Sequence, residues 1–161
     1  MSELLRRPDA FDVATKELDR AVGRGRWVTE EDMSNLPYIE AIVKETMRMH
    51  PIVPLLILCI SRENAVVGGP EGFIGRKIDV TGQDLELLPF GSGRRMCPGY
   101  KLGLKEVRLS LANLLHGFTW TLPEGMTKEE LSMEEVFGLT TSRKYPMEVV
   151  ADPKLPAHLY L

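Results

Sequence analysis

Residues 90 to 99 read Phe90-Gly-Ser-Gly-Arg-Arg-Met-Cys97-Pro-Gly99, and this stretch decides the interpretation of the whole chain. It is a glycine-rich loop that delivers one cysteine to the start of a helix expected at about 98–116. Amide groups at a helix N-terminus, together with Arg94 and Arg95, favour a thiolate over a thiol. Because the thiolate is the form that ligates metals, the sequence predicts a ligating or reactive Cys97.

Two other interpretations of the loop compete with a ligating cysteine. A phosphate-binding loop of the form G-x-x-x-x-G-K-[ST] needs a second glycine five residues after the first, but that position is Met96 when counted from Gly91 and Pro98 when counted from Gly93. The dinucleotide-binding glycine pattern also breaks at Met96. A buried structural cysteine is the common interpretation of a lone cysteine, and only the wider sequence pattern argues against it.

The composition limits the classes of protein to which the chain can belong. With 161 residues, 43% of them hydrophobic and 27% charged, the chain fits one globular domain. A net charge of -3 provides no basic field, so we expect no nucleic-acid partner. Cys59 and Cys97 lie far apart, which predicts neither a disulfide framework nor a zinc site and favours a reducing compartment. Because no long apolar run occurs, we expect no membrane anchor in this chain.

Hydrophobic periodicity predicts a mainly α fold with a minor antiparallel β component. Helices are expected at Pro8–Val22, at about 36–49 with Ser34 or Asn35 as cap, and at about 98–116 with Gly117 as its C-terminal cap. The expected apolar face of the third helix contains Leu104, Val107, Leu111, Leu114 and Leu115. Strands are expected at Ile52–Ile60, Phe118–Leu122 and Tyr145–Val150, a short helical turn at Thr127–Glu130, and a terminal extension at Pro153–Leu161. His50 and His116 are expected at helix ends, where a cationic ring suits the helix dipole.

The cysteine loop matches a known signature. It fits every fixed position of F-x-x-G-x-R-x-C-x-G, and the chain thereby resembles cytochrome P-450, the family of haem-thiolate monooxygenases. The resemblance implies haem b (iron protoporphyrin IX) as cofactor and Cys97 as the axial ligand of its iron. It implies that Arg95 pairs with a haem propionate and that Phe90 packs beside the sulfur. The glycines Gly91, Gly93 and Gly99 would permit the close turn.

A second match lies on the helix expected at about 36–49. Glu45-Thr-Met-Arg48 resembles the E-x-x-R element of the family, which is structural. An exposed ion pair, worth ~0.2–0.5 kcal/mol, is the other interpretation. In the family an arginine from a P-E-R-F-like segment completes this pair, but Gly72 stands where that arginine is expected. Several tens of residues are expected to be missing near 68–73, and Cys59 stands where relatives often carry a basic residue.

The resemblance also implies a function. Residues 1–161 would be a partial domain, the C-terminal haem-binding portion of the cytochrome P-450 fold, of the plant microsomal type. The full-length protein would use O2 to hydroxylate a small apolar plant metabolite at the cytosolic face of the endoplasmic reticulum membrane. No catalytic residue of the oxygen-activating helix is encoded. The alternatives are a non-catalytic truncated remnant without a closed haem pocket and a free haem-binding module.

Partner surfaces follow from the same resemblance. Electrons would come from an NADPH-dependent flavin reductase, which would dock on a basic face formed by Arg94, Lys101, Lys105 and Arg108. An ordinary solvated helix face explains this stripe equally well. The stretches Pro51–Leu58 and Gly138–Thr141 correspond to loops that line the substrate pocket in the family, and their apolar or small residues suit an apolar substrate.

Overall fold

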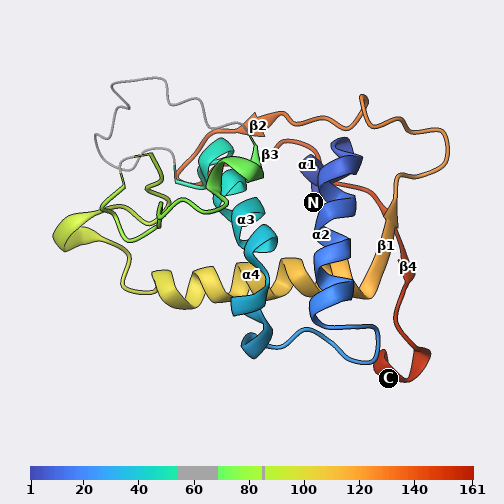
Figure 1. Ribbon diagram of the computed structural model, residues 1–161. Coiled ribbons are helices and arrows are strands. Elements are labelled where there is room, and N and C mark those ends of the chain that lie inside the picture. Colours follow the sequence, from blue (N-terminus) through green and yellow to red (C-terminus); the bar gives the residue numbers. More distant parts are fainter. Residues whose placement is uncertain (54–68, 85) are drawn as a thin grey trace.

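The computed structural model describes residues 1–53, 69–84 and 86–161, and the fold in these ranges is mainly helical (Figure 1). The α-helices are α1 (Ser2–Arg6), α2 (Pro8–Ala21), α3 (Pro37–Met49) and α4 (Tyr100–Gly117). Short 3-10 helices are η1 (Glu30–Asn35), η2 (Pro70–Phe73), η3 (Gly93–Arg95) and η4 (Ala157–Leu159). The strands are β1 (Phe118–Thr121), β2 (Glu135–Val136), β3 (Ser142–Arg143) and β4 (Val150–Pro153).

The helices pack across one another around a first hydrophobic core. In Figure 1, α2 and α3 run side by side and α4 crosses both of them. Leu18 of α2 and Leu115 of α4 are fully buried at this crossing. The core consists of Leu4, Ala14, Leu18, Val28, Leu36, Tyr38, Ile39, Ile42, Ala112 and Leu115. Burial of these side chains provides the main driving force for folding.

Helix α3 begins in a way that the sequence did not indicate. Neither Ser34 nor Asn35 caps it, because both belong to η1 and the residue before the helix is Leu36. The buried carboxylate of Glu17, on α2, instead accepts hydrogen bonds from the backbone N–H groups of Tyr38 and Ile39 at 2.9–3.1 Å. A side chain distant in sequence therefore satisfies the free donors of this helix end.

Helix α4 begins two residues later than expected and buries a narrower face. Ala112 and Leu115 are fully buried, but Val107 is 42% and Leu114 is 38% exposed. The expectation that both lie in an apolar core face was wrong in this structure, because α2 and α3 cover only part of the surface of the helix where they cross it.

The strands form two small antiparallel pairs. β1 pairs with β4, with Phe118 opposite Pro153 and Thr121 opposite Val150, and β2 pairs with β3. The strand at Phe118–Leu122 was therefore expected correctly, whereas the strand expected at Tyr145–Val150 begins only at Val150. Most of the strand expected at Ile52–Ile60 lies outside the described residues. Thr127 and Glu130 form the expected capping bonds, but they close a turn without a helix.

The last residues are bound to the body of the protein and are not a free extension. Tyr160 accepts hydrogen bonds from the N–H groups of Lys154 and Leu155 and donates to the carbonyl of Gly117. The ring of Tyr160 also packs edge-on against Trp27, at 5.3 Å between centroids. Trp27 explains why residue 117 is a glycine, because a Cβ at this position would lie 2.4 Å from the indole ring. The expectation that Gly117 caps the helix was wrong by one residue, because Gly117 is the last residue of α4 and Phe118 is the C-cap. A glycine is needed at position 117 for the close approach of Trp27.

His116 is buried rather than placed as a cation at the helix end. Its Nε2 lies 3.1 Å from the carbonyl oxygen of Arg26, and the residue is 0% exposed. Burial lowers its pKa below the ordinary value, because an apolar environment disfavours the charged ring. The expectation of a cationic His116 was therefore wrong. Within the ranges that the structure describes, no helix has the length and apolar character of a membrane span.

Candidate functional site

The cysteine loop is a compact turn held by its own backbone. The N–H of Cys97 donates to the carbonyl of Phe90 at 2.9 Å, and the N–H of Met96 donates to Gly93 at 3.2 Å. Gly91 and Gly93 adopt positive φ angles of 76° and 63°, a conformation that side chains with a Cβ disfavour. The sequence Phe90–Cys97 therefore folds back on itself and leaves Cys97 exposed with a free thiol.

The thiol has open space and glycine neighbours around it. A Cβ added to Gly99 would lie 3.9 Å from the sulfur of Cys97, and one added to Gly103 would lie 3.6 Å from the ring of Phe90. Cys97 itself precedes α4 by three residues and accepts a bond from the N–H of Tyr100 at 3.3 Å. This backbone gives a flat group access to the sulfur without a side chain in between.

A second hydrophobic core packs against the cysteine loop. Ala41, Val43 and Met47 of α3 pack with Phe73, Ile78, Val80 and Leu87. Phe90 from the loop and Tyr100 from α4 pack against this cluster while remaining partly buried. Their rings lie 6.2 Å apart. The position of the cysteine loop thus depends on contacts that begin on α3.

Glu45 and Arg48 form the ion pair that the sequence predicted on α3. Two nitrogens of Arg48 donate to the two carboxylate oxygens of Glu45 at 2.7 and 2.9 Å. Glu45 is buried and Arg48 half-buried, and the bidentate contact raises the pKa of Arg48. A fork-shaped pair of this kind is stronger than a solvent-exposed one. No third partner joins it among the described residues, in line with the absence of an arginine at Gly72.

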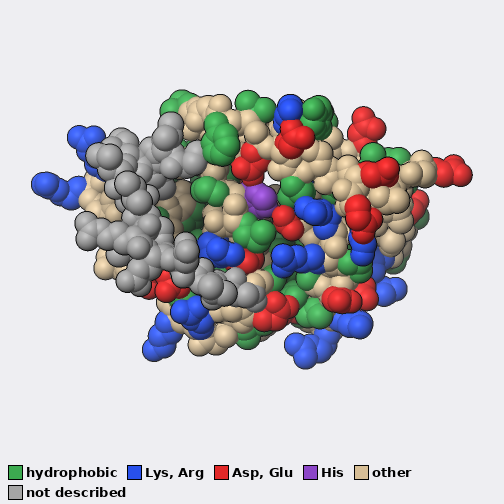
Figure 2. Space-filling model, turned by 90° about the horizontal axis from the view of Figure 1, so that it is seen from above, with side chains coloured by type: hydrophobic (Ala, Val, Ile, Leu, Met, Phe, Trp, Pro, Cys, Tyr) green, Lys and Arg blue, Asp and Glu red, His purple; other side chains and the backbone are tan. Residues whose placement is uncertain are grey.

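A cavity of about 360 Å³ opens between α1, α3, α4 and the β2–β3 pair. Figure 2 views the molecule from above and shows a histidine near the middle of this face, with hydrophobic, acidic and basic side chains interspersed around it. The walls are mainly apolar and include Leu4, Ile42, Met49, Val107 and Leu111. An apolar cavity of this size is large enough for a small organic molecule.

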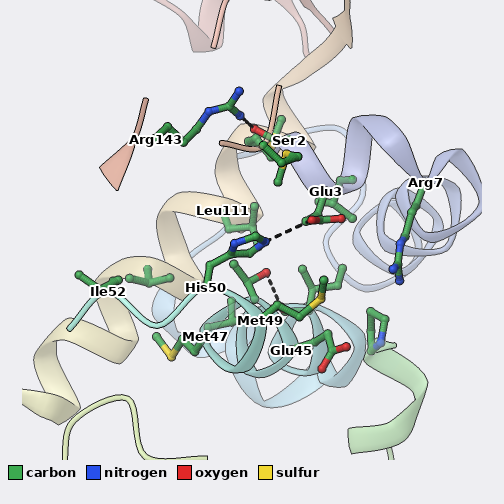
Figure 3. A pocket seen from close by; sticks show the side chains of 18 of the residues that line it. Ser2, Glu3, Arg7, Glu45, Met47, Met49, His50, Ile52, Leu111 and Arg143 are labelled. Atoms are coloured by element: carbon green, nitrogen blue, oxygen red, sulfur yellow. Dashed lines mark hydrogen bonds and ion pairs between the residues drawn. The ribbon is translucent and has the colours of Figure 1, made fainter. Parts of the chain in front are cut away.

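His50 lies on the wall of the cavity and joins two distant elements to α3. Its Nδ1 is 2.6 Å from Glu135 on β2, and its Nε2 is 3.2 Å from Glu3 on α1. Figure 3 shows the ring directed toward Glu3, with Ser2 and Arg143 beyond it. The His50 side chain therefore links the end of α3 to α1 and to β2. Nothing in the sequence indicated it, since its partners are 47 and 85 residues away.

The two stretches expected to line a substrate pocket meet at this cavity. The backbone N–H of Thr141 donates to the carbonyl of Ile52 at 2.7 Å. Both residues are part of the cavity wall. Residues 54–58 of the first stretch, and Cys59, lie outside the described residues. The remaining parts show that segments about ninety residues apart in sequence share one side of the cavity.

Two of the four residues of the expected basic face are paired with neighbouring carboxylates. Lys105 pairs with Glu30 of η1, and Arg108 contacts Glu40 of α3 at 2.5 Å. Arg94 and Lys101 are exposed. The four residues therefore do not form one free basic face. Two of them hold α4 to its neighbours, a role that the helical spacing alone cannot distinguish from a docking surface.

Comparison with known proteins gives a consistent result. The sequence matches the family model "Cytochrome P450" over residues 1–74 and 69–147. It is 51% identical to a trimethyltridecatetraene synthase and 48% identical to a dimethylnonatriene synthase, both from Zea mays. These matches cover 99% of this chain but only 35% and 36% of the relatives. The chain thus spans about a third of the length of these relatives.

A solved structure shows the same fold. The chain superposes on a zebrafish cytochrome P450 with abiraterone at a TM-score of 0.74 and 24% identity, over 95% of this chain and 41% of that one. This likeness confirms the expected fold class.

The alignments also bear on the missing segment. The alignment with the first Zea mays relative spans 195 positions. It exceeds the 161 residues of this chain, so at least 34 positions, the difference between the two lengths, have no counterpart here. The two family matches meet at residues 69–74, where the sequence predicted a gap.

Proposed function

The chain belongs to the cytochrome P450 family, and we propose that residues 90–99 are its haem-ligand loop, with Cys97 as the axial ligand of the iron. The observation that carries this proposal is the exposed thiol of Cys97 in a turn closed by the bond from Cys97 N–H to the Phe90 carbonyl. Residues 1–161 would then be a partial domain of this fold. Members of the family are haem-thiolate monooxygenases, and haem b is their cofactor.

The residues present fit such a group. An added side chain at Gly99 would stand beside the sulfur, so glycine keeps the approach to the thiol open for a planar macrocycle. Arg95 is exposed next to the cysteine and would pair with a propionate. Phe90 would shield the thiolate on its protein side, while Gly91 and Gly93 allow the turn. When bound, haem b supplies the activation of O2 and the transfer of one oxygen atom to the substrate.

For the full-length protein we infer hydroxylation or a related monooxygenation of a small apolar metabolite. Two relatives carry names that describe the synthesis of hydrocarbons. The apolar cavity beside Ile52 and Thr141 supports a substrate of the same character. Electrons would come from an NADPH-dependent flavin reductase. Its docking face would include the exposed Arg94 and Lys101 more than the paired Lys105 and Arg108. Longer plant members work at the endoplasmic reticulum membrane.

A second candidate is a non-catalytic remnant. The observation in its favour is the uncovered apolar surface of α4, where Val107 and Leu114 are exposed. Exposed apolar surface of this kind needs a covering element, and a haem pocket without one stays open to water. In this case Cys97 would keep its place in the loop without retaining iron.

One spectroscopic experiment separates the two. The chain is expressed with haem available, reduced and exposed to carbon monoxide, with Cys97→Ala as the control. A red-shifted Soret band that is lost in the control supports the ligand-loop proposal. If no such band forms, this chain holds no thiolate-ligated haem and the remnant is favoured. Consumption of NADPH and O2 with a reductase then tests for turnover.

A further inference from the structure

Tyr38 and Glu71 form a hydrogen bond between two elements that lie far apart in sequence. The phenol of Tyr38 on α3 donates to Glu71 Oε1 on η2 at 2.9 Å. Tyr38 is only 5% exposed. Burial, with the adjacent carboxylate, raises the pKa of Tyr38 to about 12. The phenol therefore remains a donor throughout the physiological pH range.

The local backbone is adapted to this contact. The second carboxylate oxygen of Glu71 folds back over Gly69, and a Cβ at Gly69 would lie 2.8 Å from it. Gly69 also has a positive φ of 71°. A larger residue at this position would be strained and would displace the carboxylate. The turn before η2 thus allows Glu71 to reach α3.

The contact lies between the two cores, because Tyr38 belongs to the first and Phe73 of η2 to the second. Phe73, two residues after Glu71, is 4% exposed and packs with Val43 and Met47 of α3. Phe90 packs against the same cluster. The carbonyl of Phe90 accepts the N–H of Cys97 at 2.9 Å. A continuous series of contacts therefore leads from the Tyr38–Glu71 bond to the cysteine.

This bond stands beside the position where an arginine is absent. Gly72 follows Glu71 directly, and the pair Glu45–Arg48 has no third partner among the described residues. Within the same residues, the phenol–carboxylate bond is the side-chain hydrogen bond that links η2 to α3. It supplies a polar anchor for η2 in this chain, about two helical turns from the Glu45–Arg48 pair.

We propose that Tyr38 and Glu71 are positioning residues for the Cys97 loop, because their bond fixes η2 on α3 and thereby fixes the cluster that supports Phe90. The relevance to iron binding rests on the proposed function. The effect on the loop does not, since it is a property of the haem-free chain.

Amide hydrogen exchange of the haem-free protein tests this role. The variants Tyr38→Phe and Glu71→Ala are compared with Tyr145→Phe, which alters an exposed tyrosine. We expect exchange at the Cys97 amide to accelerate roughly tenfold to a hundredfold in the first two variants, as for loss of one hydrogen bond to a charged group. In the double variant of Tyr38 and Glu71, exchange at the Cys97 amide should be no faster than in the faster of the two single variants. Glu71→Gln, which keeps an acceptor oxygen, should restore much of the protection.

The Leu18 amide in α2 distinguishes positioning from general destabilisation. Exchange at the Leu18 amide should be the same in the Tyr38 and Glu71 variants as in the parent chain. Unchanged exchange at Cys97, or equal acceleration at Leu18 and Cys97, would overturn the proposal. Adding haem to the same variants gives a separate result. If the parent chain shows no thiolate band, the proposed function fails while the exchange data still decide the role of Tyr38 and Glu71. If the band forms, both variants should reduce its fraction relative to Tyr145→Phe.

Discussion

The two hydrophobic cores of the molecule differ in how completely they are closed. The first core joins α1, α2, α3 and α4, and several of its members, including Leu18 and Leu115, have no exposed surface. The second joins α3 and η2 to Ile78, Val80 and Leu87. It ends on Phe90 and Tyr100, which remain partly exposed. Closed packing therefore stabilises the helices, while the core beneath Cys97 opens toward the surface.

The stability of the helices and the position of the proposed ligand loop should therefore depend mainly on different cores. Changes in the first core should lower the free energy of unfolding without specific effects on the cysteine loop. Changes at the open edge of the second core should affect the loop with little cost in stability. The expected effects below run from the largest to the smallest.

Leu18→Ala should cause the largest decrease in the free energy of unfolding. It removes a fully buried side chain from the first core, and such truncations cost about 2–5 kcal/mol. Urea denaturation followed by circular dichroism measures the change. Leu102→Ala, which truncates a leucine that is 65% exposed, is the matched control and should change stability little. Equal effects of the two substitutions would contradict the description of the first core.

Gly117→Ala should destabilise the junction between the first core and the C-terminal tail. The new methyl group would lie 2.4 Å from the ring of Trp27, and overpacking of this kind costs about 1–3 kcal/mol. Gly25→Ala is the control, since nothing lies within 4 Å of a Cβ at that position. The same denaturation experiment applies, and tryptophan fluorescence reports displacement of Trp27. An unchanged midpoint would show that Trp27 does not cover Gly117.

Glu17→Ala should cost about 1–3 kcal/mol, because two N–H groups at the start of α3 lose their buried acceptor. Glu106→Ala, on the exposed side of α4, serves as its control. Exchange of the Tyr38 and Ile39 amides should accelerate more in Glu17→Ala than exchange at the end of α3. If all amides of α3 accelerate equally, Glu17 stabilises packing and does not act as a cap.

Lowering the pH should reduce the free energy of unfolding, because His116 is buried in the folded state. Its folded-state pKa is lowered by burial, whereas an unfolded histidine titrates near pH ~6.5. The unfolded state thus binds more protons as the pH falls below ~6.5, and the free energy of unfolding declines until the pH passes the lower, folded-state value. His116→Gln should flatten this dependence, and His158→Gln, in the exposed tail, should not. Thermal melts between pH 7.5 and 5, at roughly half-unit steps, make the comparison.

Cys97→Ser should have the smallest effect on stability. The thiol is exposed, and surface substitutions usually change the free energy of unfolding by less than ~0.5 kcal/mol. The same substitution should abolish any thiolate-type Soret band. Urea melts and carbon monoxide spectra of one preparation measure both. A large loss of stability would mean that the sulfur is a packing group.

Local signals predicted the parts of the molecule whose causes are local. The helix at Pro37–Met49 follows from the proline at its start and the spacing of Ile39, Val43 and Met47, all of which are buried. The loop at 90–99 follows from its glycines. Which side of α4 is covered was not predictable, because it depends on where α2 and α3 cross it.

Features that join distant residues were missed for a physical reason. Glu17 capping α3, His50 between Glu3 and Glu135, and Tyr160 bound to Gly117 each pair groups separated by 21 residues or more. Such contacts arise only after the chain is folded, and no spacing along the sequence encodes them. The β2–β3 pair, with two residues in each strand, is too short to produce a periodic pattern.

The bond between Thr141 and Ile52 separates the frame of the cavity from its lining in this chain. It joins backbone atoms, so it holds two loops together whatever side chains they carry. A substitution at either position can then change the side chain that faces the cavity without changing the backbone that carries it. Single substitutions at Ile52 or Thr141 should therefore change the shape and polarity of the cavity while its backbone frame stays in place.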